Sequence, residues 1–312
     1  MRLLVVGGTG FLGRHVVAEL AGRGHQVAVL SRRPDAPAGE ALTGDAQRLT
    51  EDDWAGLLHG RDGVVFAAGA DDRTVPRAPA AAYFDAANVV PVRRLLAGAR
   101  RAGCRTAVLH GSYFTAIARQ RPEQALDRYH PYVRSRLAQA RAARAAAGPE
   151  LPVAVLEIPF VFGATPGRRP LWAPLVPWLR SPGPLFAPPG GTAAVTVRTV
   201  ARATAEALER ASGGDHPLAD QNLRWAELLA RFARAAGRRG PVRVHRLPPG
   251  LLHGTLCATG ALHRLRGLEA GLAPGRLAGL LTSELYLDTG AFGLAPDDLD
   301  AALRETVAAS LR

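Results

Sequence analysis

Apolar and polar positions in the first half of the chain follow two alternating periods. Short apolar runs, each bounded by glycines or polar residues, have the length and texture of buried strands. These runs lie at residues 2–6, 26–30, 63–68, 106–110 and 153–158. Apolar side chains recur at helical spacing between them, in residues 11–21, around Trp54, Leu57 and Leu58, and in residues 80–102 and 131–147. This alternation predicts crossover helices and an α/β fold with a doubly wound, parallel Rossmann-type sheet of at least five strands.

The second half of the chain has a different texture. Eight prolines between residues 166 and 189 interrupt any long regular element. A strand at 193–197 and a helix at 199–209 are expected to return to the sheet. The remaining predicted elements are helices at 225–236, 249–265 and 296–311 and a strand at 242–247. We therefore expect a dinucleotide-binding domain (residues 1–160 and 190–220) and a smaller, mostly helical C-terminal substrate lobe (residues 161–189 and 221–312).

Charge and composition narrow the function classes. The 312-residue chain has a net charge of +12 and contains no lysine, so apart from histidine its basic side chains are all arginines. The arginines are scattered as pairs rather than gathered in one run, which disfavours a nucleic-acid partner. No charged and apolar leader precedes the first strand, and no stretch approaches about 18 uninterrupted apolar residues. We expect a cytoplasmic protein that does not bind membranes.

The two cysteines give no sign of a metal site. Cys104 and Cys257 lie far apart, and neither has metal-ligand spacing around it. Two buried thiols in a reducing compartment are the favoured interpretation, so no metal is expected.

A glycine-rich turn after the first strand is the most specific motif. Gly7, Gly10 and Gly13 are spaced G-x-x-G-x-x-G, directly after a strand and at the start of a helix. The first glycine permits the tight turn, the second lets backbone N–H groups approach a pyrophosphate, and the third lets the helix pack closely on the strand. The motif therefore predicts dinucleotide binding, with a plain glycine-rich turn as the alternative.

The end of the second strand bears on the choice of cofactor. NAD-selective sites place an acidic residue there for the ribose 2′-hydroxyl, whereas Ser31, Arg32 and Arg33 follow here. Because arginine offers planar, charge-assisted donors to a 2′-phosphate, NADP(H) is favoured over NAD(H). A solvated arginine pair is the alternative. Asp45 is a candidate for the adenine amino group, or else forms a plain Asx turn.

The motifs together resemble the extended short-chain dehydrogenase/reductase superfamily, the NAD(P)-dependent epimerase/dehydratase group. The matching segments are Gly7–Gly13, Gly44-Asp45, Val64–Gly69, Asn88 with the valines after it, His110-Gly111-Ser112, Tyr132–Arg136, Pro159–Gly163 and Phe292–Pro296. The glycine loop and the tyrosine motif are the specific ones. The resemblance implies a cofactor site made of Gly7, Thr9, Gly10, Phe11, Leu12, Gly13, Ser31, Arg32, Arg33, Asp45, Ala67, Ala68, Gly69, Tyr132, Arg136 and Pro159.

The resemblance also implies the catalytic groups. In that superfamily a tyrosine moves a proton at a substrate carbonyl or hydroxyl, and a serine or threonine orients the same oxygen. A lysine one turn after the tyrosine lowers its pKa and holds the nicotinamide ribose. Tyr132 and Ser112 match these roles, but position 136 is arginine. Arg136 could keep the electrostatic role, whereas the ribose contacts need not carry over. The alternative is a structural tyrosine with a helix-surface arginine.

Several neighbouring residues are secondary candidates. Glu157 stands where the resemblance leads one to expect a basic residue, and pairing with an arginine is its favoured role. Polar and aromatic residues near the sheet edge could line a substrate pocket or belong to loops and core: Asp71, Asp72, Arg73, His110, Tyr113 and Phe114. Trp172, Trp178 and the Arg168-Arg169 pair could form a lid over the substrate. Packed tryptophans on a surface loop are the plainer alternative.

We therefore expect an NADP(H)-dependent oxidoreductase or epimerase of the extended short-chain type. It would act on a carbonyl or hydroxyl of a small-molecule substrate or nucleotide sugar. Reduction, epimerisation and dehydration share their first hydride step, so the motifs do not separate them. A non-catalytic NADP(H)-binding sensor or regulatory protein is the alternative, and a homodimer is left open.

Overall fold

A seven-stranded parallel sheet forms the centre of the protein in the computed structural model, which describes residues 1–33 and 38–312. Its strand order is β10-β6-β5-β4-β1-β2-β3, and each neighbouring pair is parallel. The strands are β1 (Arg2–Val6), β2 (Gln26–Ser31), β3 (Glu40–Thr43), β4 (Gly63–Phe66), β5 (Thr106–His110), β6 (Val153–Glu157) and β10 (Gly214–Pro217). The order reverses beside β1, so the predicted doubly wound sheet is confirmed.

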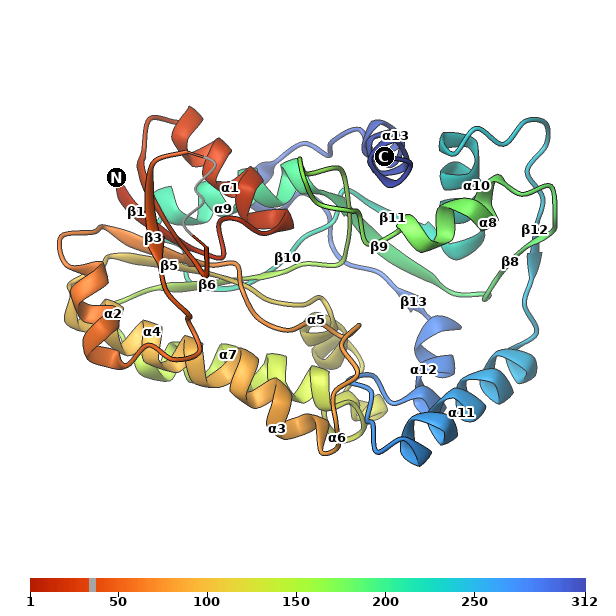
Figure 1. The fold of residues 1–312 in the computed structure, drawn as a ribbon, viewed down its shortest axis with the longest axis horizontal. Helices are drawn as coiled ribbons and strands as arrows, with labels where there is room; N and C mark the ends of the chain where they lie inside the picture. Colours follow the sequence, from red (N-terminus) through yellow and green to blue (C-terminus); the bar gives the residue numbers. More distant parts are fainter. Residues whose placement is uncertain (34–37) are drawn as a thin grey trace.

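Helices cover both faces of this sheet (Figure 1). One layer contains α1 (Phe11–Gly22) and α9 (Val197–Glu209). The other contains α2 (Glu51–Leu58), α4 (Val90–Arg101) and α7 (Pro131–Ala147). Leu3 and Val5 of β1 pack under the first layer, while Leu4 and Val6 pack under the second. Because successive side chains of a strand face opposite sides, a strand covered on both faces must be apolar throughout.

The helix predicted at residues 80–102 is divided in the structure. It consists of α3 (Ala80–Phe84), a π-helical turn (Asp85–Val89) and α4. Pro91 lies in the first turn of α4, where its missing N–H costs little. The π-turn contains Asn88, which is fully buried. Such turns insert one residue into a helix and often occur at functional sites.

The strand predicted at residues 193–197 does not return to the main sheet, which corrects that expectation. It is β9 (Gly191–Thr196), and it pairs with β7 (Phe160–Phe162), β11 (Gln221–Arg224) and β13 (Glu284–Leu285) in a second sheet. The strand that returns is β10, whose sequence Gly-Asp-His-Pro carries no apolar pattern. An edge strand that is partly exposed needs none, so periodicity could not identify it.

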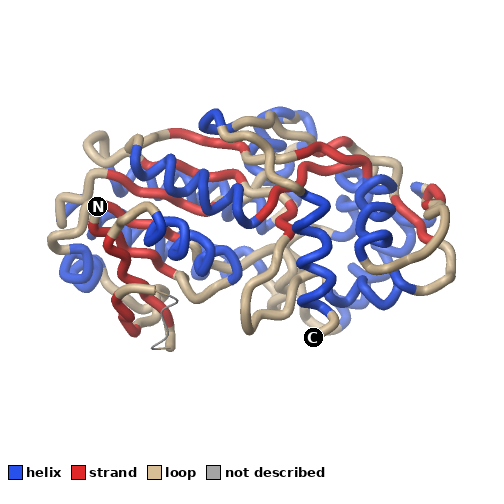
Figure 2. Tube along the Cα trace, turned by 90° about the horizontal axis from the view of Figure 1, so that it is seen from above, coloured by secondary structure: helices blue, strands red, loops and turns tan. Residues whose placement is uncertain are grey.

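The remaining elements gather at the other end of the molecule (Figure 2). All of them except α11, which packs against α12, contribute side chains to a core that contains Phe162, Trp225, Phe232 and Leu303. These elements are α8 (Val176–Arg180), β8 (Leu185–Ala187), α10 (Trp225–Ala235), β12 (Val244–Arg246), α11 (Pro249–Leu265), α12 (Pro274–Leu281) and α13 (Leu299–Ser310). Two short helices, α5 (Phe114–Gln120) and α6 (Leu126–Tyr129), lie between β5 and α7. The predicted division into domains stays a prediction.

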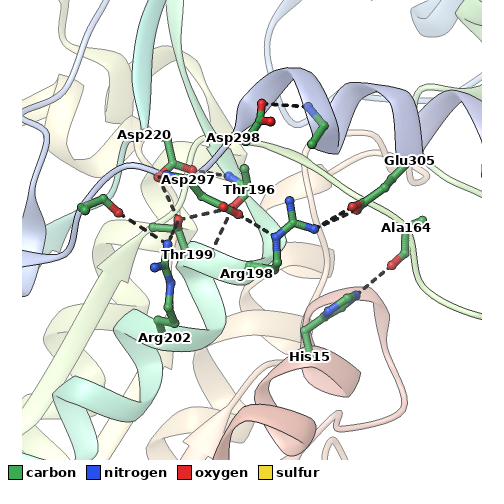
Figure 3. A network of polar contacts seen from close by, with 12 residues as sticks. His15, Ala164, Thr196, Arg198, Thr199, Arg202, Asp220, Asp297, Asp298 and Glu305 are labelled. Carbon is green, nitrogen blue, oxygen red and sulfur yellow. Dashed lines mark hydrogen bonds and ion pairs between the residues drawn. The ribbon is translucent and has the colours of Figure 1, made fainter. Parts of the chain in front are cut away.

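A buried carboxylate joins the end of the chain to the start of α9 (Figure 3). Asp220 is 3% exposed and accepts hydrogen bonds from the Thr196 N–H (2.6 Å), the Thr199 hydroxyl (2.8 Å) and the Asp297 N–H (3.0 Å). Asp297 in turn accepts from Arg198 Nε at 2.7 Å, and Arg198 also reaches Glu305 of α13 at 2.8 Å. Burial opposes the charge of Asp297, but bonds from Thr196 and Arg198 outweigh it and hold its pKa below the ordinary value.

Removing the Asp220 carboxylate should destabilise the fold. Asp220→Ala leaves three donors without their acceptor, two of them main-chain N–H groups, and we expect the free energy of unfolding to fall by about 2 to 4 kcal/mol. Urea unfolding followed by circular dichroism measures the change. Asp288→Ala removes an exposed carboxylate and serves as the control. Equal unfolding midpoints for the two variants would contradict this role for Asp220.

Candidate functional site

The glycine loop connects β1 to α1, and its first and last glycines leave no room for a side chain. Gly7 has a φ of +82°, and a methyl group built on it would lie 2.9 Å from the Ala67 carbonyl oxygen. A methyl group on Gly13 would lie 2.2 Å from the Gly7 carbonyl oxygen. Gly10 starts α1 with no side-chain cap, and the first turn has no acidic residue. Since uncapped N–H groups at a helix start suit an anion, this cradle fits a pyrophosphate.

The cofactor-selecting segment follows β2 directly. The Ser31 hydroxyl hydrogen-bonds to the Arg33 carbonyl, which turns the chain sharply there. Arg32 and Arg33 are both exposed. Asp45 forms a turn, because its carboxylate accepts the Gln47 N–H at 3.1 Å and lies 3.7 Å from Arg48 Nε. Asp45 therefore forms the Asx turn that was the alternative to adenine binding.

Asn88 fixes the chain where β4 ends. Its side-chain oxygen accepts the Ala70 N–H at 2.8 Å, and its amide nitrogen donates to the Ala70 carbonyl at 3.2 Å. Gly69 has a φ of +119°, and a methyl group there would lie 2.6 Å from the Asn88 oxygen. Ala67 and Ala68, just before it, are half-buried. The close contact with Asn88 therefore requires glycine at position 69, whatever else this segment binds.

Arg136 is buried at the edge of the sheet and held by neutral acceptors. It is 8% exposed, and its Nη2 donates to the Ala70 carbonyl at 3.0 Å. Its Nη1 donates to Gln139 Oε1 at 2.9 Å, while Gln139 donates to the Asn88 carbonyl at 2.9 Å. Among the described residues no carboxylate forms an ion pair with Arg136, and its Nε is buried without a partner. The predicted alternative of a helix-surface arginine is therefore wrong.

Tyr132 and Ser112 lie in the same buried region as Arg136. Both residues are 4% exposed. The Arg136 guanidinium lies 5.2 Å from the centre of the Tyr132 ring, which also packs edge-on against Phe84 and Phe114. The Ser112 Oγ accepts the Phe114 N–H at 3.4 Å. The carboxyl ends of β4 and β5 and the start of α7 thus converge, although no hydrogen bond joins the hydroxyls of Ser112 and Tyr132 among the described contacts.

A segment of the second half of the chain, residues 267–273, covers Tyr132. The Gly271 carbonyl accepts the Tyr132 N–H at 3.0 Å, and a methyl group on Gly271 would lie 2.9 Å from Tyr132 Cβ. Glu269 accepts the Ala80 N–H at 2.7 Å, and His130 Nδ1 accepts the Ala273 N–H at 2.9 Å. Sequence reasoning missed this segment, because no local pattern marks a contact between positions so far apart.

Two of the secondary candidates are explained by packing. His110 Nε2 lies 3.0 Å from the Thr204 hydroxyl of α9, and burial, assisted by the charge of Arg136, lowers its pKa to about 4. Tyr113 is buried against Phe114 and Phe160, and burial raises its pKa. Both side chains are therefore neutral near pH 7.

Two of the three acidic candidates, Glu157 and Asp71, form ion pairs with arginines, and the third, Asp72, forms none within the described part of the chain. Glu157 is fully buried, accepts Arg119 Nη2 at 2.6 Å and hydrogen-bonds to Thr115, so the favoured pairing with an arginine is observed. Asp71 pairs with Arg73. Asp72 is half-buried, and burial together with the neighbouring Asp71 raises its pKa.

The tryptophans of the proline-rich stretch pack into the core of the smaller part. Trp172 stacks on Phe162 at 5.0 Å and donates its Nε1–H to the Val161 carbonyl at 3.1 Å. Trp178 packs against the same core, and Pro159 is buried between β6 and β7. Packed tryptophans, rather than a free lid, describe this stretch. Arg168 instead reaches the glycine loop, where its Nη2 donates to the Thr9 carbonyl at 3.0 Å.

The described residues contain neither a candidate metal cluster nor a helix that could span a membrane. No group of three or more histidine, cysteine or acidic side chains there could hold a metal ion. No helix in the same residues is long and apolar enough to cross a membrane.

Buried His130 should make stability depend on pH. It is 1% exposed, and burial, with Arg276 nearby, lowers its pKa from 6.5 to about 4. Between these values the unfolded chain binds more protons, so the free energy of unfolding falls as pH drops from 7 towards 4. We expect His130→Gln to reduce the loss between pH 7 and pH 5 by about 2 kcal/mol, measured by denaturant unfolding. His59→Gln, at an exposed site, should leave the pH dependence unchanged; a matching reduction in that control would contradict the assignment.

Known proteins resemble this chain in sequence and in fold. Residues 3–178 match the model of the NAD dependent epimerase/dehydratase family. The structure is similar to that of gox2253 (22% identity, 98% of this chain and 96% of that chain, TM-score 0.76). It is also similar to the Stenotrophomonas maltophila UDP-glucose-4-epimerase with bound NAD and formylated UDP-arabinopyranose (20% identity, 100% of this chain and 98% of that chain, TM-score 0.66). Human epimerase family protein SDR39U1 with NADPH is another structural neighbour (21% identity, 99% of this chain and 99% of that chain, TM-score 0.66). No curated protein matches the chain.

Proposed function

The chain belongs to the NAD dependent epimerase/dehydratase family, and on that premise we propose that it is an NADP(H)-dependent oxidoreductase or epimerase. Its substrate would be a small molecule bearing a carbonyl or hydroxyl, with nucleotide sugars as one class. The observation that carries the proposal is the buried Arg136 cation, which lies beside the Tyr132 ring and has no carboxylate partner among the described residues. A buried cation that no ion pair neutralises favours negative charge on the groups around it, and the half-buried carboxylate of Asp72 also lies within the reach of its charge.

The chain's own residues would hold the cofactor along the carboxyl edge of the sheet. The loop from Gly7 to Gly13 would bind the pyrophosphate, and exposed Arg32 and Arg33 would bind the 2′-phosphate. Asp45 would lie near the adenine, and Ala67, Ala68 and Gly69 would permit close approach. When bound, the nicotinamide would accept or donate a hydride at the substrate carbon. Structural neighbours were solved with NADPH and with NAD, so the preference proposed here rests on Arg32 and Arg33 alone.

The proton would be handled by Tyr132 and Ser112. The Tyr132 hydroxyl would give or take the proton of the substrate oxygen, and the Ser112 hydroxyl would orient that oxygen. The Arg136 cation would favour negative charge on the Tyr132 oxygen. Both Nη atoms of Arg136 already donate to Ala70 and Gln139, so a second role in holding the nicotinamide ribose is not proposed for them.

A non-catalytic NADP(H)-binding protein is the second candidate. The observation that favours it is the pair of hydrogen bonds from Arg136 to Gln139 and to the Ala70 carbonyl, which also suits a purely structural arginine beneath the cofactor.

Nucleotide sugars are included among the proposed substrates because a neighbour of this fold was solved with a UDP-sugar derivative.

The catalytic assignment is tested by Tyr132→Phe. Loss of general acid–base catalysis should lower turnover by about 100-fold or more, while NADPH affinity stays within about threefold of wild type. NADPH consumption with a panel of carbonyl compounds, and epimer formation from UDP-sugars, would be measured. Tyr129→Phe on α6 is the matched control and should keep full turnover. If Tyr132→Phe binds NADPH and turns over every accepted substrate as fast as wild type, the catalytic proposal fails.

The cofactor preference is tested at the end of β2. The double variant Arg32→Ala/Arg33→Ala should weaken NADPH binding by about 10-fold or more and leave NADH binding unchanged, since only NADPH carries the 2′-phosphate. Isothermal titration gives both affinities, and Arg180→Ala on α8 controls for lost positive charge. Equal NADPH and NADH affinities before and after the double substitution would rule out the 2′-phosphate contact.

A further inference from the structure

A tight turn lies beside the glycine loop although it belongs to the proline-rich stretch. It comprises Thr165, Pro166, Gly167 and Arg168, and the Arg168 N–H donates to the Thr165 carbonyl at 3.1 Å. Gly167 has a φ of +70°. Proline followed by glycine at the two central positions is the composition that a type II turn requires.

This turn is fastened to the start of α1. The Thr165 hydroxyl, 3% exposed as a residue, donates to the Phe11 carbonyl at 3.0 Å. His15 Nε2 lies 2.9 Å from the Ala164 carbonyl oxygen and 3.1 Å from Thr165 Oγ1; Figure 3 shows the contact with Ala164. Just before the turn, Gly163 exchanges hydrogen bonds of 2.9 and 3.0 Å with the Thr306 hydroxyl of α13. Contacts with α1 and α13 therefore fix the turn that carries Arg168.

The turn places a cation where the protein supplies no anion. Exposed Arg168 donates from Nη2 to the Thr9 carbonyl at 3.0 Å. It has no ion pair with a carboxylate among the described residues. The neighbouring start of α1 has neither a side-chain cap nor an acidic residue in its first turn. A helix N-terminus is itself positive, so an arginine held beside it is unfavourable until an anion binds between them.

We propose that Arg168 is a ligand of the cofactor's pyrophosphate at the glycine loop. This inference rests on the proposed binding of a nicotinamide dinucleotide at that loop. Arginine suits the role because its planar donors can bind a phosphate and a carbonyl at the same time. The adjacent Arg169 is also exposed but makes no described contact with the loop, so it provides a matched control.

Binding measurements on the full chain test the proposal. NADPH and NADH are titrated into wild type, Arg168→Gln, Arg168→Lys and Arg169→Gln by isothermal calorimetry. A lost charge-assisted bond should raise the Kd of Arg168→Gln by about 10- to 100-fold, with Arg168→Lys intermediate and Arg169→Gln within about threefold. Raising the salt concentration should weaken wild-type binding more steeply than binding to Arg168→Gln. An unchanged Kd for Arg168→Gln overturns the proposal.

Two further measurements separate a ligand from a structural residue. ADP-ribose contains the pyrophosphate and AMP does not, so Arg168→Gln should weaken ADP-ribose binding and leave AMP binding nearly unchanged. The thermal midpoint of the nucleotide-free protein should also stay the same. A lower midpoint, with both ligands weakened equally, would show that Arg168 only holds the turn in place.

The test of Arg168 gives a different result from a failure of the proposed catalytic function. Full turnover by Tyr132→Phe would refute the catalytic assignment and leave the binding result for Arg168 standing. Absence of NADPH and NADH binding to wild type would overturn both proposals together.

Discussion

The hydrogen bonds around the Ala70 carbonyl hold together the region in which the candidate site lies. This one oxygen accepts from Asn88 and from Arg136, and thereby joins the chain after β4, the π-turn and α7. Gln139 completes the arrangement by bridging Arg136 to the Asn88 carbonyl. Leaving a buried polar group unpaired costs free energy, so these hydrogen bonds favour one geometry for the residues that they join. That geometry also holds Arg136, and with it the Tyr132 end of α7, next to the end of β5.

The arginine at position 136 is built into this arrangement. A guanidinium has five donors in a fixed plane, whereas an ammonium group has three that rotate freely. The Ala70 carbonyl and the Gln139 side chain supply acceptors for its two Nη atoms, while Nε stays buried without a partner among the described residues. The chain has no lysine at all, so arginine would have to supply any fixed cation at this position. Because its hydrogen bonds hold the Arg136 side chain in place, that side chain suits an electrostatic role better than a role in which it must move to bind a ligand.

Distant segments close around the same edge of the sheet. Residues 267–273 cover Tyr132, and the turn ending at Arg168 reaches the glycine loop. The Asp220 carboxylate ties the chain before α13 to the start of α9. Each contact joins parts of the chain that are far apart in sequence, and each uses main-chain groups. The smaller part of the protein therefore has a defined position relative to the predicted cofactor loop.

The sequence by itself determined the elements whose cause is local. Alternating apolar runs and helical spacing predicted β1, β2, β4, β5, β6 and α7, and the glycine spacing predicted the turn into α1. The four-residue interval from Tyr132 to Arg136 likewise places both side chains on one helix face. Only the tertiary structure decided that β10 rather than β9 completes the sheet, that Arg136 is buried, and that Gly271 and Arg168 reach the site. Local periodicity records which face of an element is buried, but not which distant surface buries it, because that depends on packing across the whole chain.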